Sequence, residues 1–229
     1  MEAIILAGGL GTRLRKVVAD LPKPMAPVNG KPFLHYLFQW LGKYNASTIV
    51  ISAGYRHEVI SRHFGDSFSG IPLEYVIEEK PLGTGGAVIR SLKSTEAEDV
   101  LIVNGDTWFP IDLYEFHSRH AMYGHIFSIA LKRMHDFSRY GAVETDGYDI
   151  TGFSEKKHTA GGLINGGIYL VKRSFFEARQ FPEVFSLEKD LLTGEAGKHV
   201  LKGVVFDDPF IDIGIPEEYL RAGSVIGDE

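Results

Sequence analysis

Short apolar runs alternate with amphipathic stretches along the chain up to residue 131. The apolar runs are continuous, which is typical of strands buried on both faces of a parallel sheet. They lie at residues 3–6, 48–52, 73–77, 100–103 and 126–131. Between them, apolar residues recur at helical spacing over residues 32–44, 54–64, 83–92 and 112–122. This alternation predicts an α/β fold with a Rossmann-like, doubly wound, mostly parallel sheet.

From residue 141 onward, the pattern changes to strand-like segments with few helices between them, at residues 141–145, 150–155, 163–171 and 199–206. These segments predict an antiparallel extension of the sheet and a lid over its ligand-binding edge. A short helix is expected over residues 187–192 with Ser186 as its N-cap, and a final helix is expected to begin near Pro216. No linker rich in Pro, Gly or Ser separates the halves, so residues 1–229 are expected to form a single domain.

Composition narrows the class of protein. A chain of 229 residues with 44% hydrophobic residues is large enough for a sizeable core. The net charge of −6 argues against nucleic acid as a partner, and the absence of cysteine excludes disulfides and thiol catalysis. No apolar run approaches the ~18 residues of a membrane span, and the first apolar run is too short for a signal peptide. We therefore expect a cytoplasmic protein with no membrane partner. The aromatic residues Tyr114, Phe116 and Tyr123 could belong to the core or to an interface, which leaves a homo-oligomer open.

A glycine-rich segment follows the first predicted strand. Residues 7–25 read AGGLGTRLRKVVADLPKPM, in which closely spaced glycines precede Arg13, and Lys23 lies between Pro22 and Pro24. Glycines let backbone N–H groups approach a ligand closely, and fixed cations favour anions, so the segment could grip a polyphosphate. The segment lacks the GK[ST] of a phosphate-loop ATPase and the spacing of a dinucleotide fingerprint. A tight turn with surface cations is the alternative interpretation. The flanking prolines fix the backbone at Lys23, which favours a binding role.

Several blocks together give the sequence a family resemblance. The blocks GGLGTRL, LPKPMAPVNGKP, PLGTGGA, VNGDTW, SEKK, INGGIYL and FIDIGIPEEY occur in order over nearly the whole chain. The chain thereby resembles the sugar-1-phosphate nucleotidyltransferases, which have the nucleotide-diphospho-sugar transferase fold. The resemblance implies that an NTP and a sugar 1-phosphate react to give a nucleotide sugar and pyrophosphate. It further implies that Arg13 holds the leaving pyrophosphate and that Lys23 contacts the reacting phosphates.

The resemblance also assigns binding residues to the two substrates. It implies nucleotide binding by residues 1–135 and sugar binding by residues 136–229. The nucleotide-binding candidates are Leu6, Ala7, Gly8, Gly9, Gly11, Thr12, Glu78, Glu79, Gly83, Thr84 and Asp106. The sugar-phosphate candidates are Gly141, Glu155, Lys156, Asn165 and Gly166. An exposed hairpin turn at Glu155 and Lys156 and a glycine bulge at Gly166 are the alternatives. The family's usual proline after the lysine is replaced here by Lys157, so this segment departs from the family pattern.

Two aspartates are candidate metal ligands. Asp106 follows an apolar run, and Asp212 lies within the apolar segment FIDIG. Carboxylates at separate strand ends can hold one Mg²⁺ and leave positions for phosphate oxygens and water. Capping of a turn or helix is the alternative for either residue. The family resemblance favours the metal and therefore implies Mg²⁺ as the cofactor.

Glu78 and Glu79 precede the GTGGA block, in the region where thymidylyl and uridylyl relatives use a Gln to read the base. A carboxylate only accepts hydrogen bonds, and guanine offers two adjacent donors, N1–H and the 2-amino group. Uracil and thymine offer one donor flanked by carbonyl groups. If either glutamate reaches the base, GTP is the expected substrate. Two solvated loop charges, and with them UTP or another nucleotide, are the alternative.

The residues do not specify the sugar. The compact chain is similar to short guanylyltransferases that act on a heptose 1-phosphate. Short mannose-1-phosphate guanylyltransferases and uridylyltransferases for amino-sugar or muramic acid 1-phosphates share most of the blocks. A degenerate, non-catalytic nucleotide-sugar-binding subunit is also conceivable. Such a subunit would be expected to lack Arg13, Lys23 or an acidic metal ligand, and all of these are present.

Overall fold

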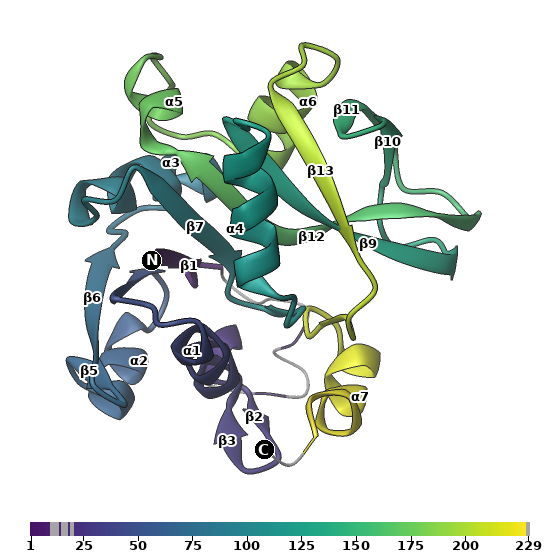
Figure 1. Cartoon of the computed structure of the whole chain (residues 1–229). Coiled ribbons are helices and arrows are strands. Elements are labelled where there is room, and N and C mark those ends of the chain that lie inside the picture. Colours follow the sequence, from purple (N-terminus) through teal and green to yellow (C-terminus); the bar gives the residue numbers. More distant parts are fainter. Residues whose placement is uncertain (10–13, 15–17, 19–20, 228–229) are drawn as a thin grey trace.

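The continuous apolar runs form the parallel centre of the sheet. The computed structural model describes residues 1–9, 14, 18 and 21–227. In it, β1 (Glu2–Leu6), β4 (Thr48–Ala53), β6 (Ile71–Ile77) and β7 (Asp99–Asn104) run parallel in the order β7-β1-β4-β6 (Figure 1). Successive residues of β1 face opposite layers, because Ala3 and Ile5 pack in one hydrophobic cluster and Ile4 packs in the other. Burial on both faces explains why these strands are uniformly apolar rather than alternating.

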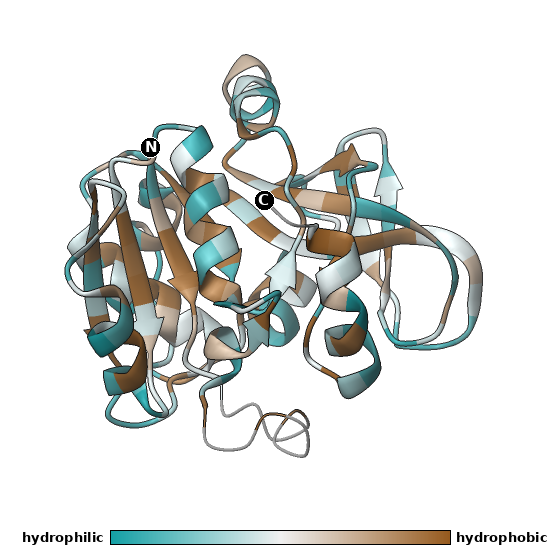
Figure 2. Cartoon of the chain, turned by 90° about the horizontal axis from the view of Figure 1, so that it is seen from below, coloured by the Kyte–Doolittle hydropathy of each residue, from teal (hydrophilic) through white to brown (hydrophobic). Residues whose placement is uncertain are grey.

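Helices cover both faces of this sheet. One cluster includes residues of α1 (Phe33–Lys43), α2 (His57–Phe64) and α4 (Leu113–Met122). The opposite cluster includes residues of α3 (Gly83–Ser91) and α5 (Arg173–Glu177). Figure 2 shows the hydrophobic colour concentrated on the strands and on the inward sides of the helices. The doubly wound α/β prediction is confirmed.

The second half of the chain extends the sheet. Its strands are β9 (Phe127–Phe137), β10 (Ala142–Asp146), β11 (Asp149–Phe153), β12 (Thr159–Lys172) and β13 (Leu201–Phe206). β12 lies between β7 and β9 and is antiparallel to both, while β13 is parallel to β9. β10 pairs with both β11 and β12. The predicted antiparallel extension is therefore present, and the complete ten-stranded sheet is mixed.

The remaining helices and strands complete the described part of the chain. They are the 3₁₀ helices η2 (Lys23–Met25) and η3 (Leu92–Ser94), the strands β2 (Pro27–Val28), β3 (Lys31–Pro32), β5 (Ser67–Phe68), β8 (Thr107–Trp108) and β14 (Ile211–Asp212), the π-helix η4 (Leu187–Leu192), and the helices α6 (Thr193–Glu195) and α7 (Pro216–Ile226). The Ser186 hydroxyl accepts the Lys189 N–H at the start of η4, so the predicted N-cap is confirmed. Pro216 begins α7 as expected.

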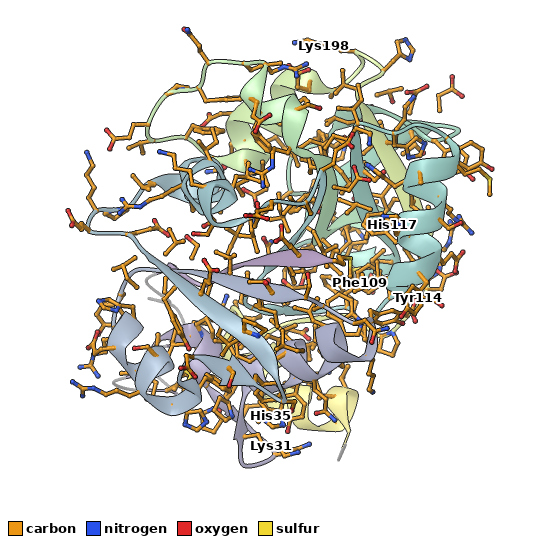
Figure 3. All side chains as sticks on the ribbon, turned by 60° about the vertical axis from the view of Figure 1, so that its left-hand side comes forward. Lys31, His35, Phe109, Tyr114, His117 and Lys198 are labelled. Carbon is orange, nitrogen blue, oxygen red and sulfur yellow. The ribbon has the colours of Figure 1, made fainter. Side chains whose placement is uncertain are left out.

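The aromatic residues of α4 and its C-cap, Tyr123, divide between core and surface. Phe116 is fully buried, whereas Tyr114 and Tyr123 are 58% and 53% exposed. Tyr114 and His117 lie on the outer side of α4, and Phe109 lies inside the molecule just before it (Figure 3). Within the described residues, no helix has both the length and the apolar character needed to cross a bilayer.

Candidate functional site

A cavity of about 400 Å³ lies where β1 and β7 end. From β1 the chain continues to β4 on one side of it, and it later returns to β7 on the other side (Figure 1). The strand order therefore reverses between β1 and β7. In doubly wound sheets, ligands bind at the carboxyl ends of the strands at such a switch point. The predicted site residues that line the cavity are Leu6, Ala7, Gly8, Gly9, Lys23, Glu78, Gly83, Thr84 and Asp106. Gly11, Thr12 and Arg13 lie outside the residues that the structure describes.

A small two-stranded sheet brings the two predicted metal ligands together. Asp106 lies in the two-residue turn between β7 and β8, and Asp212 ends β14. β14 is antiparallel to β8, with Asp212 opposite Thr107, and the Ile213 N–H donates to the Asp106 carbonyl at 3.0 Å. Two aspartates more than a hundred positions apart are thus held side by side, and Asp106 of the pair lines the cavity.

Lys23 lies between these carboxylates. Its ammonium group donates a hydrogen bond to Asp106 Oδ2 and lies 3.7 Å from Asp212 Oδ1. The Lys23 side chain is only 12% exposed, because η2 begins at this residue and holds its backbone against α1. A fixed ammonium group at this position can neutralise an anion that enters the cavity.

The pKa of Asp212 depends on its burial and on the charged groups beside it. Burial raises the pKa of Asp212, and the negative charge of Asp106 raises it further. The Lys23 ammonium, the Gly214 N–H (2.7 Å from Asp212 Oδ1) and the Arg139 guanidinium act in the opposite direction. A β-carbon at Gly214 would lie 2.7 Å from Asp212 Oδ1 and 2.8 Å from Lys23 Nζ. A side chain at this position would therefore displace Asp212 or Lys23 from its present place.

The aspartate pair fits a divalent cation. Both side chains offer hard oxygen donors, and their partial exposure of 35% and 28% leaves them accessible. Their mutual repulsion would be relieved by a cation. The described residues contain no cluster of three or more His, Asp or Glu side chains with metal-ligand geometry. A metal on Asp106 and Asp212 would therefore take its other ligands from phosphate oxygens and water.

Glu78 and Glu79 differ in position. The Glu78 carboxylate lines the cavity and accepts hydrogen bonds from Ser52 Oγ (3.1 Å) and the Leu82 N–H (3.2 Å). It lies so close to Gly8 that a β-carbon there would be 2.3 Å from Glu78 Oε1. Glu79 is exposed and does not belong to the cavity lining. If one of the two reads a base, the geometry selects Glu78.

The predicted sugar-phosphate residues lie apart from this cavity. Glu155 and Lys156 are exposed between β11 and β12, and Asn165 is half-buried on β12. A β-carbon at Gly166 would lie 2.6 Å from the Phe109 ring, and one at Gly141 would lie 2.4 Å from the Ser154 carbonyl. Both glycines are thus required for packing within the protein. Their contact with a sugar stays a prediction.

Sequence reasoning missed Glu188 as a residue of the cavity, and it gave no binding role to Asn104, which it expected at this edge of the sheet. Asn104 ends β7, and its buried Oδ1 has no hydrogen-bond partner among the described residues. Glu188 reaches the cavity from the π-helix η4. The only local signal for Glu188 is the capped helix start at Ser186, since a glutamate near a helix N-terminus is ordinarily a solvated residue. Its position is set by the packing of η4 against α3.

The model of the nucleotidyl transferase family matches residues 2–228. The chain belongs to this family, which confirms the resemblance. The reaction of the family typically involves a divalent metal ion.

Particular relatives match almost the whole chain. The D-glycero-alpha-D-manno-heptose 1-phosphate guanylyltransferase of Aneurinibacillus thermoaerophilus is 46% identical over 97% of this chain and 96% of its own length. The enzyme of the same name from Campylobacter jejuni is 45% identical over 96% of this chain and 97% of its own length. Among solved structures, HddC from Yersinia pseudotuberculosis has a TM-score of 0.87 at 36% identity, covering 97% and 98% of the two chains. A second HddC structure, complexed with GMP-PN, has a TM-score of 0.86.

Proposed function

We propose that this protein transfers a guanylyl group from GTP to D-glycero-α-D-manno-heptose 1-phosphate, forming GDP-heptose and pyrophosphate. The observation that carries this proposal is the full-length similarity to two guanylyltransferases of that name, combined with a carboxylate, Glu78, in the switch-point cavity. The HddC complex with GMP-PN supports a guanine nucleotide in a closely similar fold.

The reaction needs no covalent intermediate on the protein. An oxygen of the sugar phosphate attacks the α-phosphorus of GTP and forms a new P–O bond. The bond from the α-phosphorus to the oxygen that bridges it to the β-phosphorus breaks, and its electron pair leaves with pyrophosphate. The protein must align and neutralise several anionic groups. In this proposal, Lys23 acts on the transferred phosphate and Arg13 acts on the leaving pyrophosphate. Backbone N–H groups of Gly8 and Gly9 contact the triphosphate.

Mg²⁺ is the proposed cofactor, held by Asp106 and Asp212. When bound, it would neutralise part of the charge on the phosphates. The two aspartates supply its protein oxygen ligands. Lys23 lies beside both aspartates and would contact an oxygen of the transferred phosphate.

Glu78 is the proposed reader of the base. Ser52 and the Leu82 N–H occupy part of its hydrogen-bonding capacity and fix its orientation. A carboxylate has about four acceptor sites, so it can still accept from the N1–H and the 2-amino group of guanine. A uracil edge would direct carbonyl oxygens at the same negative charge.

The sugar half of the site is also a proposal. Residues 1–135 would bind the nucleotide, and residues 136–229 would bind the sugar phosphate. Glu155 would contact sugar hydroxyls, Lys156 the sugar phosphate, and Asn165 the sugar ring. Because Glu155 and Lys156 are exposed and lie outside the cavity, sugar binding in this proposal requires their segment to approach the nucleotide. A cytoplasmic location and a homo-oligomer stay predictions.

The release of pyrophosphate tests this proposal. The protein is mixed with GTP, Mg²⁺ and, in separate reactions, the 1-phosphates of the heptose, mannose and N-acetylmuramic acid. We expect the highest kcat/KM with the heptose 1-phosphate and loss of the reaction when EDTA removes the metal. A higher kcat/KM with mannose 1-phosphate would show that mannose 1-phosphate, and not the heptose 1-phosphate, is the preferred substrate. Absence of pyrophosphate with all three sugar phosphates would contradict guanylyl transfer.

A further inference from the structure

The two oxygens of the Glu188 carboxylate differ in their surroundings. The Thr84 hydroxyl donates to Glu188 Oε2 at 2.6 Å, and the Ser186 hydroxyl donates to the same oxygen at 3.2 Å. Oε1 has no hydrogen-bond partner among the residues that the structure describes, and it is not one of the buried side-chain atoms that lack a partner. Since Glu188 lines the cavity, this accessible oxygen is available to a ligand there.

The segment that carries Glu188 packs closely against the start of α3. The Phe185 N–H donates to the Leu82 carbonyl at 3.1 Å, and the Gly85 N–H donates to the Phe185 carbonyl at 3.0 Å. A β-carbon at Gly83 would lie 2.4 Å from the Phe185 carbonyl oxygen, and one at Gly85 would lie 2.1 Å from the Phe185 ring. Side chains at these two positions would push the segment away. Glu188 is therefore placed by close contacts with the helix that begins next to it.

The first turn of α3 also relates Glu188 to Glu78, the proposed reader of the base. The Leu82 N–H donates to Glu78 Oε2 at 3.2 Å, and Thr84, two residues further on, donates to Glu188. Both carboxylates line the same cavity, and they are held by donors only two residues apart. In a nucleotide, the ribose is bonded directly to the base. The part of the ligand that adjoins a base at Glu78 is therefore the ribose.

The chemistry of a carboxylate restricts what the accessible oxygen can bind. A carboxylate only accepts hydrogen bonds, and its negative charge repels phosphate groups. The donors of a guanine base are assigned to Glu78 in the proposed function. The proposed sugar-phosphate residues, all of which the structure describes, lie outside this cavity. The remaining donors are the 2′- and 3′-hydroxyl groups of the ribose.

We propose that Glu188 binds the ribose of the nucleotide, with Oε1 accepting hydrogen bonds from the 2′- and 3′-hydroxyl groups. One carboxylate oxygen has about two acceptor sites, so it can serve both hydroxyl groups. Glu188 thereby makes the protein select ribonucleotides over deoxyribonucleotides. This inference rests on the proposed function, because it takes a nucleoside triphosphate as the substrate of the cavity. It does not depend on the identity of the base, since the ribose is common to GTP and UTP.

Nucleotides that lack one ribose hydroxyl test this contact. The kcat/KM for pyrophosphate release is measured with GTP, 2′-deoxy-GTP and 3′-deoxy-GTP at a saturating concentration of the heptose 1-phosphate. Wild type should prefer GTP over at least one analogue by about tenfold or more, the equivalent of one hydrogen bond to a charged group. In Glu188→Ala, this preference should fall to twofold or less, because the acceptor of the hydroxyl group is gone.

Glu188→Gln keeps the test informative if Glu188→Ala does not fold. Its amide oxygen can accept from Thr84 and Ser186, and its NH₂ group then replaces the accessible oxygen. The preference for GTP should fall at least about threefold, because a neutral partner forms a weaker hydrogen bond than a carboxylate. Glu183→Gln is the matched control and should keep the wild-type preference. Glu183 is an exposed glutamate of the same segment that pairs with Lys80 and does not belong to the cavity lining.

Three results would overturn the inference. Wild type could fail to distinguish GTP from either analogue, or both Glu188 variants could keep the wild-type preference. The third result is a higher KM for the heptose 1-phosphate in Glu188→Ala with the preference for GTP retained, because the accessible oxygen would then bind a hydroxyl group of the sugar.

Calorimetric titration without the sugar phosphate separates this inference from the proposed function. Wild type and Glu188→Ala are titrated, in the presence of Mg²⁺, with GTP, UTP and their 2′-deoxy and 3′-deoxy forms. If wild type releases no pyrophosphate but binds the ribonucleotides more tightly, and Glu188→Ala loses this difference, the proposed function fails and the ribose contact stands. Pyrophosphate release from GTP with an unchanged preference in Glu188→Ala would leave the function and refute the contact. Absence of binding to all of these nucleotides would refute both.

Discussion

At the scale of single residues, the site brings Lys23, Asp106 and Asp212 together in a partly buried position. Lys23 contacts Asp106 and approaches Asp212, and a β-carbon at position 214 would displace Asp212 or Lys23. Burial and the charge of Asp106 raise the pKa of Asp212. Such arrangements are typical of binding sites, in which part of the stability of the fold is given up for function.

The proposed contact of Glu78 with the base gives a first residue-scale prediction. Glu78→Gln should lower kcat/KM for GTP by about 10- to 100-fold, because one charge-assisted hydrogen bond to guanine is replaced by a mismatched amide. Steady-state kinetics with GTP measure this effect. Glu79→Gln makes the same chemical change at an exposed position outside the cavity and should leave kcat/KM within twofold of wild type. Equal effects of the two substitutions would eliminate Glu78 as the reader.

Asp212 gives a second residue-scale prediction. Its pKa is higher in the folded protein than in the unfolded chain. Protonation of Asp212 therefore stabilises the fold below the unfolded pKa, and this contribution to stability is lost as pH rises through the folded pKa. Asp212→Asn should therefore unfold at an equal or higher temperature than wild type at pH 7, and this advantage should shrink as pH falls toward 4. Thermal unfolding across this pH range measures it. The same variant should lose at least about 100-fold in kcat if Asp212 holds the metal. Lower stability than wild type at pH 7 would show that the hydrogen bond from Gly214 outweighs the repulsion.

At the scale of elements, the pairing of β8 with β14 brings the two proposed metal ligands, Asp106 and Asp212, together. The sequence placed Asp106 at a strand end correctly, because an apolar run ending in a polar residue is a local pattern. The strands β8 and β14 are only two residues long, too short to leave a periodic signal. Their pairing depends on how α7 packs against the rest of the chain, which no local pattern encodes.

The contact at Gly214 supplies an element-scale prediction. Its φ lies outside the left-handed region, so alanine can adopt the backbone, but the new β-carbon would displace Asp212 or Lys23. Gly214→Ala should lower kcat about tenfold or more through loss of alignment, with little change in melting temperature. Gly194→Ala is the control, because nothing lies within 4 Å of a β-carbon there. Wild-type kcat in Gly214→Ala would mean that the close approach of the charges is not needed for catalysis.

At the scale of the whole molecule, local patterns predicted the elements better than their neighbours in space. The parallel strands and the helices α1 to α4 were expected, because their apolar periodicity is strong. The insertion of β12 between β7 and β9 was not expected, because the order of strands in a sheet depends on pairing between distant segments. The cavity contains Glu78, Lys23 and Asp106 as predicted, but the sequence could not show that Glu188 reaches the cavity from a distant π-helix.

Acid stability gives a prediction for the whole fold. His120 is fully buried between α4 and the sheet, bonded to Ser128 Oγ at 2.8 Å, and burial lowers its pKa to about 4. A lowered pKa contributes stability above the unfolded pKa of 6.5, which is lost as pH falls toward 4. The free energy of unfolding should fall by an amount on the order of 3 kcal/mol over this interval.

Denaturant unfolding at several pH values measures this loss. His120→Gln should flatten the dependence on pH between 6.5 and 4. His158→Gln should keep the wild-type slope, because His158 is 74% exposed. An unchanged slope in His120→Gln would mean that other groups dominate the acid response.

The central claim concerns which nucleotide this fold transfers to which sugar. A competition experiment tests it most directly, because the product ratio reports the ratio of kcat/KM values. The protein is incubated with equal concentrations of GTP, UTP, ATP and CTP, Mg²⁺ and a limiting amount of D-glycero-α-D-manno-heptose 1-phosphate, and mass spectrometry identifies the products. The account predicts GDP-heptose as the dominant nucleotide sugar. A predominance of UDP-heptose, or the absence of any nucleotide heptose, would contradict it.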